Sequence, residues 1–145
     1  MAEILPVCIP LGGGASVAAT AGGAMFHPGR KFELLGVRFG GPSAITGHAS
    51  NFAAVQVVGS DETSVIWEWS TDSAKEGTVA ASTVYYTSDE EAPGGTGDTA
   101  QDFDAAETKT LRTYDANQGL EVNITKGGSG VAIIDAALTL LIRYL

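Results

Sequence analysis

Acidic residues are the most conspicuous groups in this sequence that could do chemistry. Asp98, Asp102 and Asp104 follow three further acids at positions 89–91, all within the polar segment 88–104. Carboxylates at this density can bind calcium, although their spacing does not match an EF-hand, which needs acids at alternate positions and a closing Glu. Two interpretations follow: a solvated acidic loop, which we favour, and a calcium site.

Other chemistry-bearing residues are sparse and badly spaced for catalysis. The two histidines, His27 and His48, lie far apart beside turn residues, and Cys8 is the single cysteine. Neither a zinc-binding spacing nor a Gly-x-Ser-x-Gly nucleophile elbow is present. We therefore predict that the chain is not an enzyme and uses no cofactor or metal, and that Cys8 is an inert residue buried in an apolar strand.

Two tryptophans share one face of a predicted strand. Trp67 and Trp69 are two residues apart, and Val65 precedes them on the same face. The apolar neighbour favours burial of both indoles in the core. The alternatives are an aromatic platform that stacks on sugars, and a protein interface, where Trp is enriched.

The elements that must position these side chains are predicted to be β-strands. Period-2 alternation recurs along the chain, and no segment sustains helical periodicity for three turns. In the strand Lys31 to Phe39 we expect Leu35, Val37 and Phe39 to share a face opposite Phe32 and Leu34. Further strands are expected at 52–58, 64–70, 78–87, 107–113 and 120–125. The last, 136–145, is apolar on both faces, which is typical of a central or covered strand.

Length and composition fit one domain with many turns. The chain has 145 residues, 19 of them Gly, and eight or nine strands separated by turns predict a single all-β sandwich, a jelly roll or a related Greek key. The charge is uneven: residues 61–121 carry fourteen acids against three basic residues, whereas both ends are nearly neutral. Nucleic acid and anionic membranes are therefore poor partners. No signal peptide or membrane span is recognisable.

The C-terminal half resembles the closing hairpin of small phage β-sandwich proteins. The resemblance rests on Asp115-Ala-Asn-Gln-Gly-Leu-Glu-Val-Asn-Ile-Thr, Lys-Gly-Gly-Ser-Gly and the Ile-Arg-Tyr-Leu ending, with Lys31 to Phe39 similar to the opening core strand. The chain is most similar to the capsid decoration, or cement, proteins of tailed phages. The resemblance implies a structural virion protein, often a trimer, that clamps neighbouring subunits of the major capsid protein with its body and an extended terminal arm.

On this resemblance the chain divides into an arm, residues 1–17, and a sandwich domain, residues 18–145. From the residues alone, the apolar segment 3–9 with Pro6 suits either an edge strand or an extended arm. As an arm it would stay extended because of Pro6 and Pro10, and could add a strand to a neighbour's sheet. Its expected capsid-contact residues are Ile4, Leu5, Pro6, Val7, Ile9, Pro10 and Leu11. The protein would be made in the host cytoplasm and lie on the outer capsid surface, with its acidic middle facing solvent. The alternative is a carbohydrate- or host-receptor-binding module of a phage head or tail, using Trp67, Trp69 or the 88–104 loop.

Overall fold

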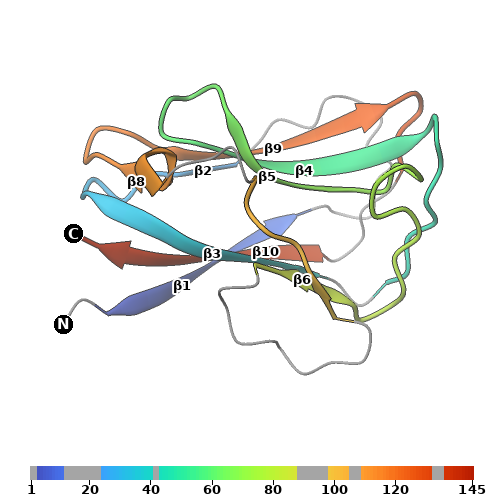
Figure 1. Cartoon of the computed structure of the whole chain (residues 1–145), viewed down its shortest axis with the longest axis horizontal. Helices are drawn as coiled ribbons and strands as arrows, with labels where there is room; N and C mark the ends of the chain where they lie inside the picture. The colour runs from blue at the N-terminus through green and yellow to red at the C-terminus, as the bar shows by residue number, and fades with distance from the viewer. Residues whose placement is uncertain (1–2, 12–23, 41–42, 88–97, 105–108, 132–135) are drawn as a thin grey trace.

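Two β-sheets packed face to face form the protein (Figure 1). The computed structural model describes residues 3–11, 24–40, 43–87, 98–104, 109–131 and 136–145. Its elements are β1 (Ile4–Leu11), β2 (Ala24–Phe26), β3 (Phe32–Gly40), β4 (Phe52–Val58), β5 (Val65–Ser70), β6 (Val84–Tyr86), β7 (Thr99–Ala100), the short 3-10 helix η1 (Lys109–Arg112), β8 (Thr113–Tyr114), β9 (Leu120–Gly127) and β10 (Ala136–Tyr144). The predicted single-domain all-β sandwich is confirmed.

The strand order brings distant parts of the chain together. Sheet A runs β1-β10-β3-β6-β7, with β8 also pairing with β3, and sheet B runs β2-β9-β4-β5. All neighbours are antiparallel except β6 and β7. Strand β10 lies between β1 and β3, which confirms the expectation that its two apolar faces mark a central strand. Among the described residues, the helices include none long and apolar enough to cross a membrane.

The core lies between the sheets and is rich in aromatic side chains. Phe32 stacks on Tyr114 with 4.8 Å between ring centroids, and Phe39 packs against Trp69 at 4.4 Å. The Tyr114 hydroxyl, carried on sheet A, donates a 2.7 Å hydrogen bond to the Val58 carbonyl of sheet B. Burial, together with the nearby Asp61 carboxylate, raises the pKa of Tyr114 far above its ordinary value, so this hydroxyl remains a donor that links the two sheets.

A β-bulge corrects the predicted face assignment of β3. The pairing with β10 skips one residue, because Leu141 lies opposite Gly36 whereas Ile142 lies opposite Leu34. The extra residue, Leu35, shifts the inward–outward alternation of side chains by one position. As a result Phe32, Leu34, Val37 and Phe39 all enter the core. Strict alternation wrongly placed the first two of these residues on the opposite face from the last two.

Two further strand predictions are wrong in part. Of residues 78–87 only Val84–Tyr86 form a strand, with a single bridge from Val79 to Ile45. In the 107–113 segment, Lys109–Arg112 form η1 and the strand begins at Thr113. Both segments are short connections held by tertiary contacts, which a periodicity argument does not detect.

Candidate functional site

The residues expected to form an extended arm belong instead to a sheet. Strand β1 pairs with β10 along its whole length, from Ile4 opposite Arg143 to Leu11 opposite Ala136. It lies at the edge of sheet A (Figure 1). An arm that leaves the body is therefore not confirmed for residues 4–11, and its remaining residues 1–2 and 12–17 lie outside the described ones.

Pairing with β10 separates the expected contact residues into two groups. Leu5, Val7 and Ile9 are half-buried and pack against the core, so they stabilise the fold. Ile4, Pro6 and Pro10 face outward, and Ile4 is 58% exposed. Cys8 shares this outward face and is exposed, so the prediction of a buried thiol is wrong. Leu11 ends the strand, and its side chain is outside the described part.

The outer face of sheet A continues from β1 across its neighbours. The register places Cys8 beside Thr139, Arg38 and Tyr86, and places Pro10 beside Ala137, Gly40 and Val84, as rows that cross four strands. Small residues at the centre of the second row leave a hollow of about 280 Å³. It is lined by Arg38, Phe39, Gly40, Val84, Ala137 and Thr139. This face therefore offers an exposed apolar row beside a depression.

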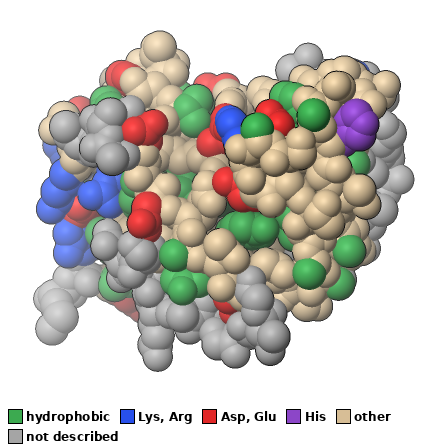
Figure 2. Space-filling model, turned by 45° about the vertical axis from the view of Figure 1, so that its right-hand side comes forward, with side chains coloured by type: hydrophobic (Ala, Val, Ile, Leu, Met, Phe, Trp, Pro, Cys, Tyr) green, Lys and Arg blue, Asp and Glu red, His purple; other side chains and the backbone are tan. Residues whose placement is uncertain are grey.

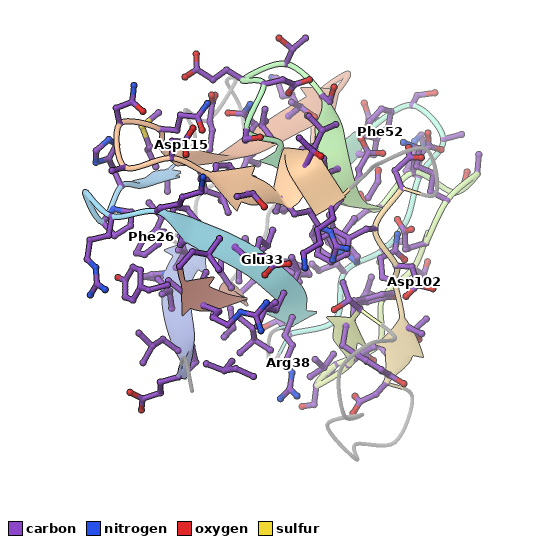
Figure 3. All side chains as sticks on the ribbon, turned by 60° about the vertical axis from the view of Figure 1, so that its left-hand side comes forward. Phe26, Glu33, Arg38, Phe52, Asp102 and Asp115 are labelled. Carbon is purple, nitrogen blue, oxygen red and sulfur yellow. The ribbon has the colours of Figure 1, made fainter. Side chains whose placement is uncertain are left out.

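A buried carboxylate lies further along the same face. Glu33 is 4% exposed and bonds to Arg143 Nη2 at 2.5 Å and to Lys109 Nζ at 3.1 Å. Burial alone would raise the pKa of Glu33, but the two cations outweigh it and hold the pKa below its ordinary value. Lys and Arg side chains gather at this end of the molecule in Figure 2, and Figure 3 shows Glu33 and Arg38 along β3. The cluster ties β10 and η1 to β3.

Both tryptophans lie in the core. Trp67 is 1% exposed and Trp69 is fully buried, so neither indole face is available to a sugar. Trp67 Nε1 donates a 2.9 Å hydrogen bond to the Gln101 carbonyl. Both tryptophans are therefore core residues, as their apolar neighbour indicated.

A second hollow of about 400 Å³ lies along β5 and is bordered mainly by charged residues. Its lining is Val65, Trp67, Glu68, Lys75, Glu76, Gln101, Asp102 and Asp104. Glu68 pairs with Lys75 and also accepts a 2.6 Å hydrogen bond from Gln56 Nε2. Its charge is therefore already compensated within the fold.

The described ranges contain no group of three or more His, Cys, Asp or Glu that could hold a metal. Asp98 accepts a 3.0 Å hydrogen bond from the Val84 amide, so this acid anchors a chain segment. His48 Nδ1 accepts the amides of Ser50 and Asn51, each at 3.0 Å, and thereby shapes a turn. Residues 88–97 of the acidic loop lie outside the described part.

Sequence reasoning missed two structural roles. Glu33 lies between Phe32 and Leu34 in the sequence, and a carboxylate flanked by large apolar residues in a core strand is a signal for a buried ion pair. Gln101 carries three hydrogen bonds: its amide to the Tyr86 carbonyl, its carbonyl from Trp67, and its side-chain Nε2 to the Glu68 carbonyl. No sequence pattern identifies such a residue, because all three partners are distant in the chain.

Comparisons with known proteins do not assign the chain to a family. The outward face of sheet A and the hollow along β5 are therefore interpreted from their own chemistry. A search of protein-family models finds no match to the chain, and no curated protein matches it significantly.

Proposed function

We propose that this chain is a structural binding protein of a phage virion, which attaches to the outer capsid surface and bridges neighbouring subunits of the major capsid protein. The observation that carries the proposal is the exposed row Ile4, Pro6, Cys8 and Pro10 on β1, next to the hollow at Gly40 and Ala137. Exposed apolar side chains beside a depression are typical of a protein-docking face. The partner is inferred from the resemblance to cement proteins.

The proposed mode of attachment uses side chains on this face. Pro6 and Pro10 lie four residues apart on an edge strand, so both direct their nitrogens to the same side, away from the sheet, where proline is tolerated. Two of the four backbone nitrogens from Ile4 to Pro10 on that side therefore carry no hydrogen. Addition of a partner strand to β1 is accordingly disfavoured, and docking of the apolar row is the better mechanism.

The alternative of a sugar-binding module has lost its main support. Trp67 and Trp69, two of the three features that could form its site, are buried in the core. The third feature, the 88–104 loop, lies for the most part outside the described residues. Bridging of capsid subunits also fits a homotrimer, since several weak contacts then act together. We therefore retain the virion-binding proposal, with a trimer as its expected state and no catalytic activity.

The test compares two exposed apolar residues on opposite sheets. Ile4 on β1 is 58% exposed and Met25 on β2 is 64% exposed. Purified wild-type, Ile4→Asp and Met25→Asp proteins are mixed with tailed-phage capsids stripped of their own decoration proteins, and bound protein is measured after gradient sedimentation. We expect Ile4→Asp to weaken binding about tenfold or more, and Met25→Asp to bind like the wild type. Equal binding by all three folded proteins, or no binding to any capsid, would overturn the proposal.

A further inference from the structure

Strand β5 forms the outer edge of sheet B, and three of its outward backbone groups are occupied. Every second residue, namely Ile66, Glu68 and Ser70, directs its backbone away from β4. The Ile66 carbonyl accepts the Asp104 amide at 2.9 Å, and the Glu68 carbonyl accepts Gln101 Nε2 at 2.7 Å. The Ser70 amide donates to Glu76 Oε2 at 2.6 Å. Three of the six backbone groups that another strand would use, the two carbonyls and one amide, are therefore already bonded.

The segment that supplies most of these bonds, Asp98–Asp104, crosses from sheet A to sheet B; we name it the strap. Figure 1 shows it as the ochre trace in front of the two sheets. On sheet A it is held by the parallel β6–β7 pairing, by the Gln101 amide on the Tyr86 carbonyl at 2.6 Å, and by Asp98 on the Val84 amide. On sheet B it contacts β5. The strap is therefore anchored independently of the edge that it covers.

Charge reinforces this protection against a second copy. Three acids, Glu76, Asp102 and Asp104, line the hollow along β5 together with the ion pair between Glu68 and Lys75 (Figure 3 labels Asp102). Two copies that approached each other edge to edge would bring two such acidic rims together, and like charges at close range are repulsive. Both the bonded edge and the acidic rim therefore oppose the same event.

The other sheet edges differ in a way that explains why β5 needs a cover. β2 has three residues and β7 has two, so they offer few groups for pairing, and β1 contains two prolines. β5 has six residues without proline and contains two tryptophans. A long apolar edge strand of this kind is a site of edge-to-edge association when it is uncovered.

We propose that the strap is an edge guard, which prevents β5 from pairing with the β5 strand of a second copy and so restricts self-association through sheet B. This inference concerns a surface distinct from the capsid-binding face of sheet A and does not depend on it. When the strap is displaced, the outward groups of Ile66 and Glu68 are freed and two β5 edges can pair antiparallel.

The test releases the strap by two substitutions that remove its bonds to β5. Gln101→Ala deletes the donor to Glu68, and Asp104→Pro deletes the amide donor to Ile66; Ala100→Ser, at an exposed strap position, is the matched control. Loss of the cover is followed by tryptophan fluorescence, because Trp67 bonds to the Gln101 carbonyl. Sedimentation velocity over a range of concentrations then measures association.

We expect the double variant to show red-shifted fluorescence and to form assemblies larger than the wild type at concentrations about tenfold lower, while Ala100→Ser matches the wild type. If the double variant does not fold, Gln101→Glu serves instead, since its carboxylate repels the Glu68 carbonyl and loosens the strap. A folded variant with exposed Trp67 whose mass distribution equals that of the wild type at every concentration would contradict the guard. So would unchanged fluorescence in both variants, because the strap would then not depend on these bonds.

Discussion

The two long free edges of the sandwich are protected in different ways. β1 carries its protection in its own covalent structure, because Pro6 and Pro10 offer no amide hydrogen. β5 has no proline and is protected by groups from elsewhere in the chain: Asp104, Gln101 and Glu76. The proline protection persists in any conformation, whereas the protection of β5 exists only in the folded state. Sheet A therefore combines an exposed apolar face with an edge blocked by proline, whereas the β5 edge of sheet B is covered by other parts of the chain.

The side chains of β5 and β1 also differ in how deeply they are buried. β5 buries Ile66, Trp67 and Trp69 almost completely, whereas β1 contributes only half-buried residues to the core. β5 is therefore a major support of the fold, and β1 combines a modest role in stability with an exposed surface. Mutations can test this division of roles directly.

The largest expected effect is on the β5 side of the comparison. Trp69 is fully buried between Phe39 and Tyr85, so Trp69→Ala leaves a large cavity and should reduce the free energy of unfolding by about 3–5 kcal/mol. On β1, Val7→Ala removes part of a half-buried side chain and should cost about 1 kcal/mol. Urea unfolding followed by circular dichroism measures both. Equal losses would show that β1 supports the core as strongly as β5.

A smaller loss of stability is expected at Glu33, whose ion pair with Arg143 links β3 to β10, the neighbour of β1. Glu33→Gln removes the charge shared by Arg143 and Lys109, and should cost about 1–2 kcal/mol near neutral pH, because both cations are partly exposed and regain water. Glu62→Gln, at an exposed turn position, is the control and should be neutral.

The pH dependence of this loss follows from the direction of the pKa shift. The pKa of Glu33 is lower in the folded state than its ordinary value of about 4.3, so the folded state holds the charged form more tightly. Its stabilising contribution is complete above that ordinary value and disappears as the pH falls through the folded pKa. The stability difference between the wild type and Glu33→Gln should therefore shrink in acid. A constant difference across the acid range would mean that the carboxylate charge contributes nothing.

The sequence predicts the sandwich well where alternation is undisturbed. In β9, Leu120, Val122 and Ile124 face the core as their spacing indicates, and β10 is central because both of its faces are apolar. The prediction fails at Leu35, where a bulge shifts the phase, because a bulge depends on pairing with β10. For β1 the sequence also left two alternatives, an edge strand and an arm. Only its pairing with β10, which is distant in the chain, distinguishes them.

The candidate surface could be predicted only in part. Pro6 indicated an edge strand or an extended arm, and the apolar residues of this segment were visible in the sequence. Which of these residues face outward depends on the β1–β10 register, and this register turned Leu5, Val7 and Ile9 inward. In the sequence the strap is recognisable only as part of a polar loop. Its proposed function depends on hydrogen bonds between residues more than thirty positions apart, such as Trp67 and Gln101, which are 34 positions apart.

The smallest effect on stability, and the most direct comparison of the two edges, comes from restoring an amide on β1. Pro6→Thr should cost about 0.4–1 kcal/mol, chiefly because the unfolded chain gains freedom. It also gives the outer edge of β1 a hydrogen-bond donor, so weak concentration-dependent association should appear in sedimentation velocity. Cys8→Thr is the matched control: it places the same residue on the same exposed face without adding a donor. If both variants associate equally, the cause is the side chain. If only Pro6→Thr associates, β1 is protected by its missing amides, just as β5 is protected by its strap.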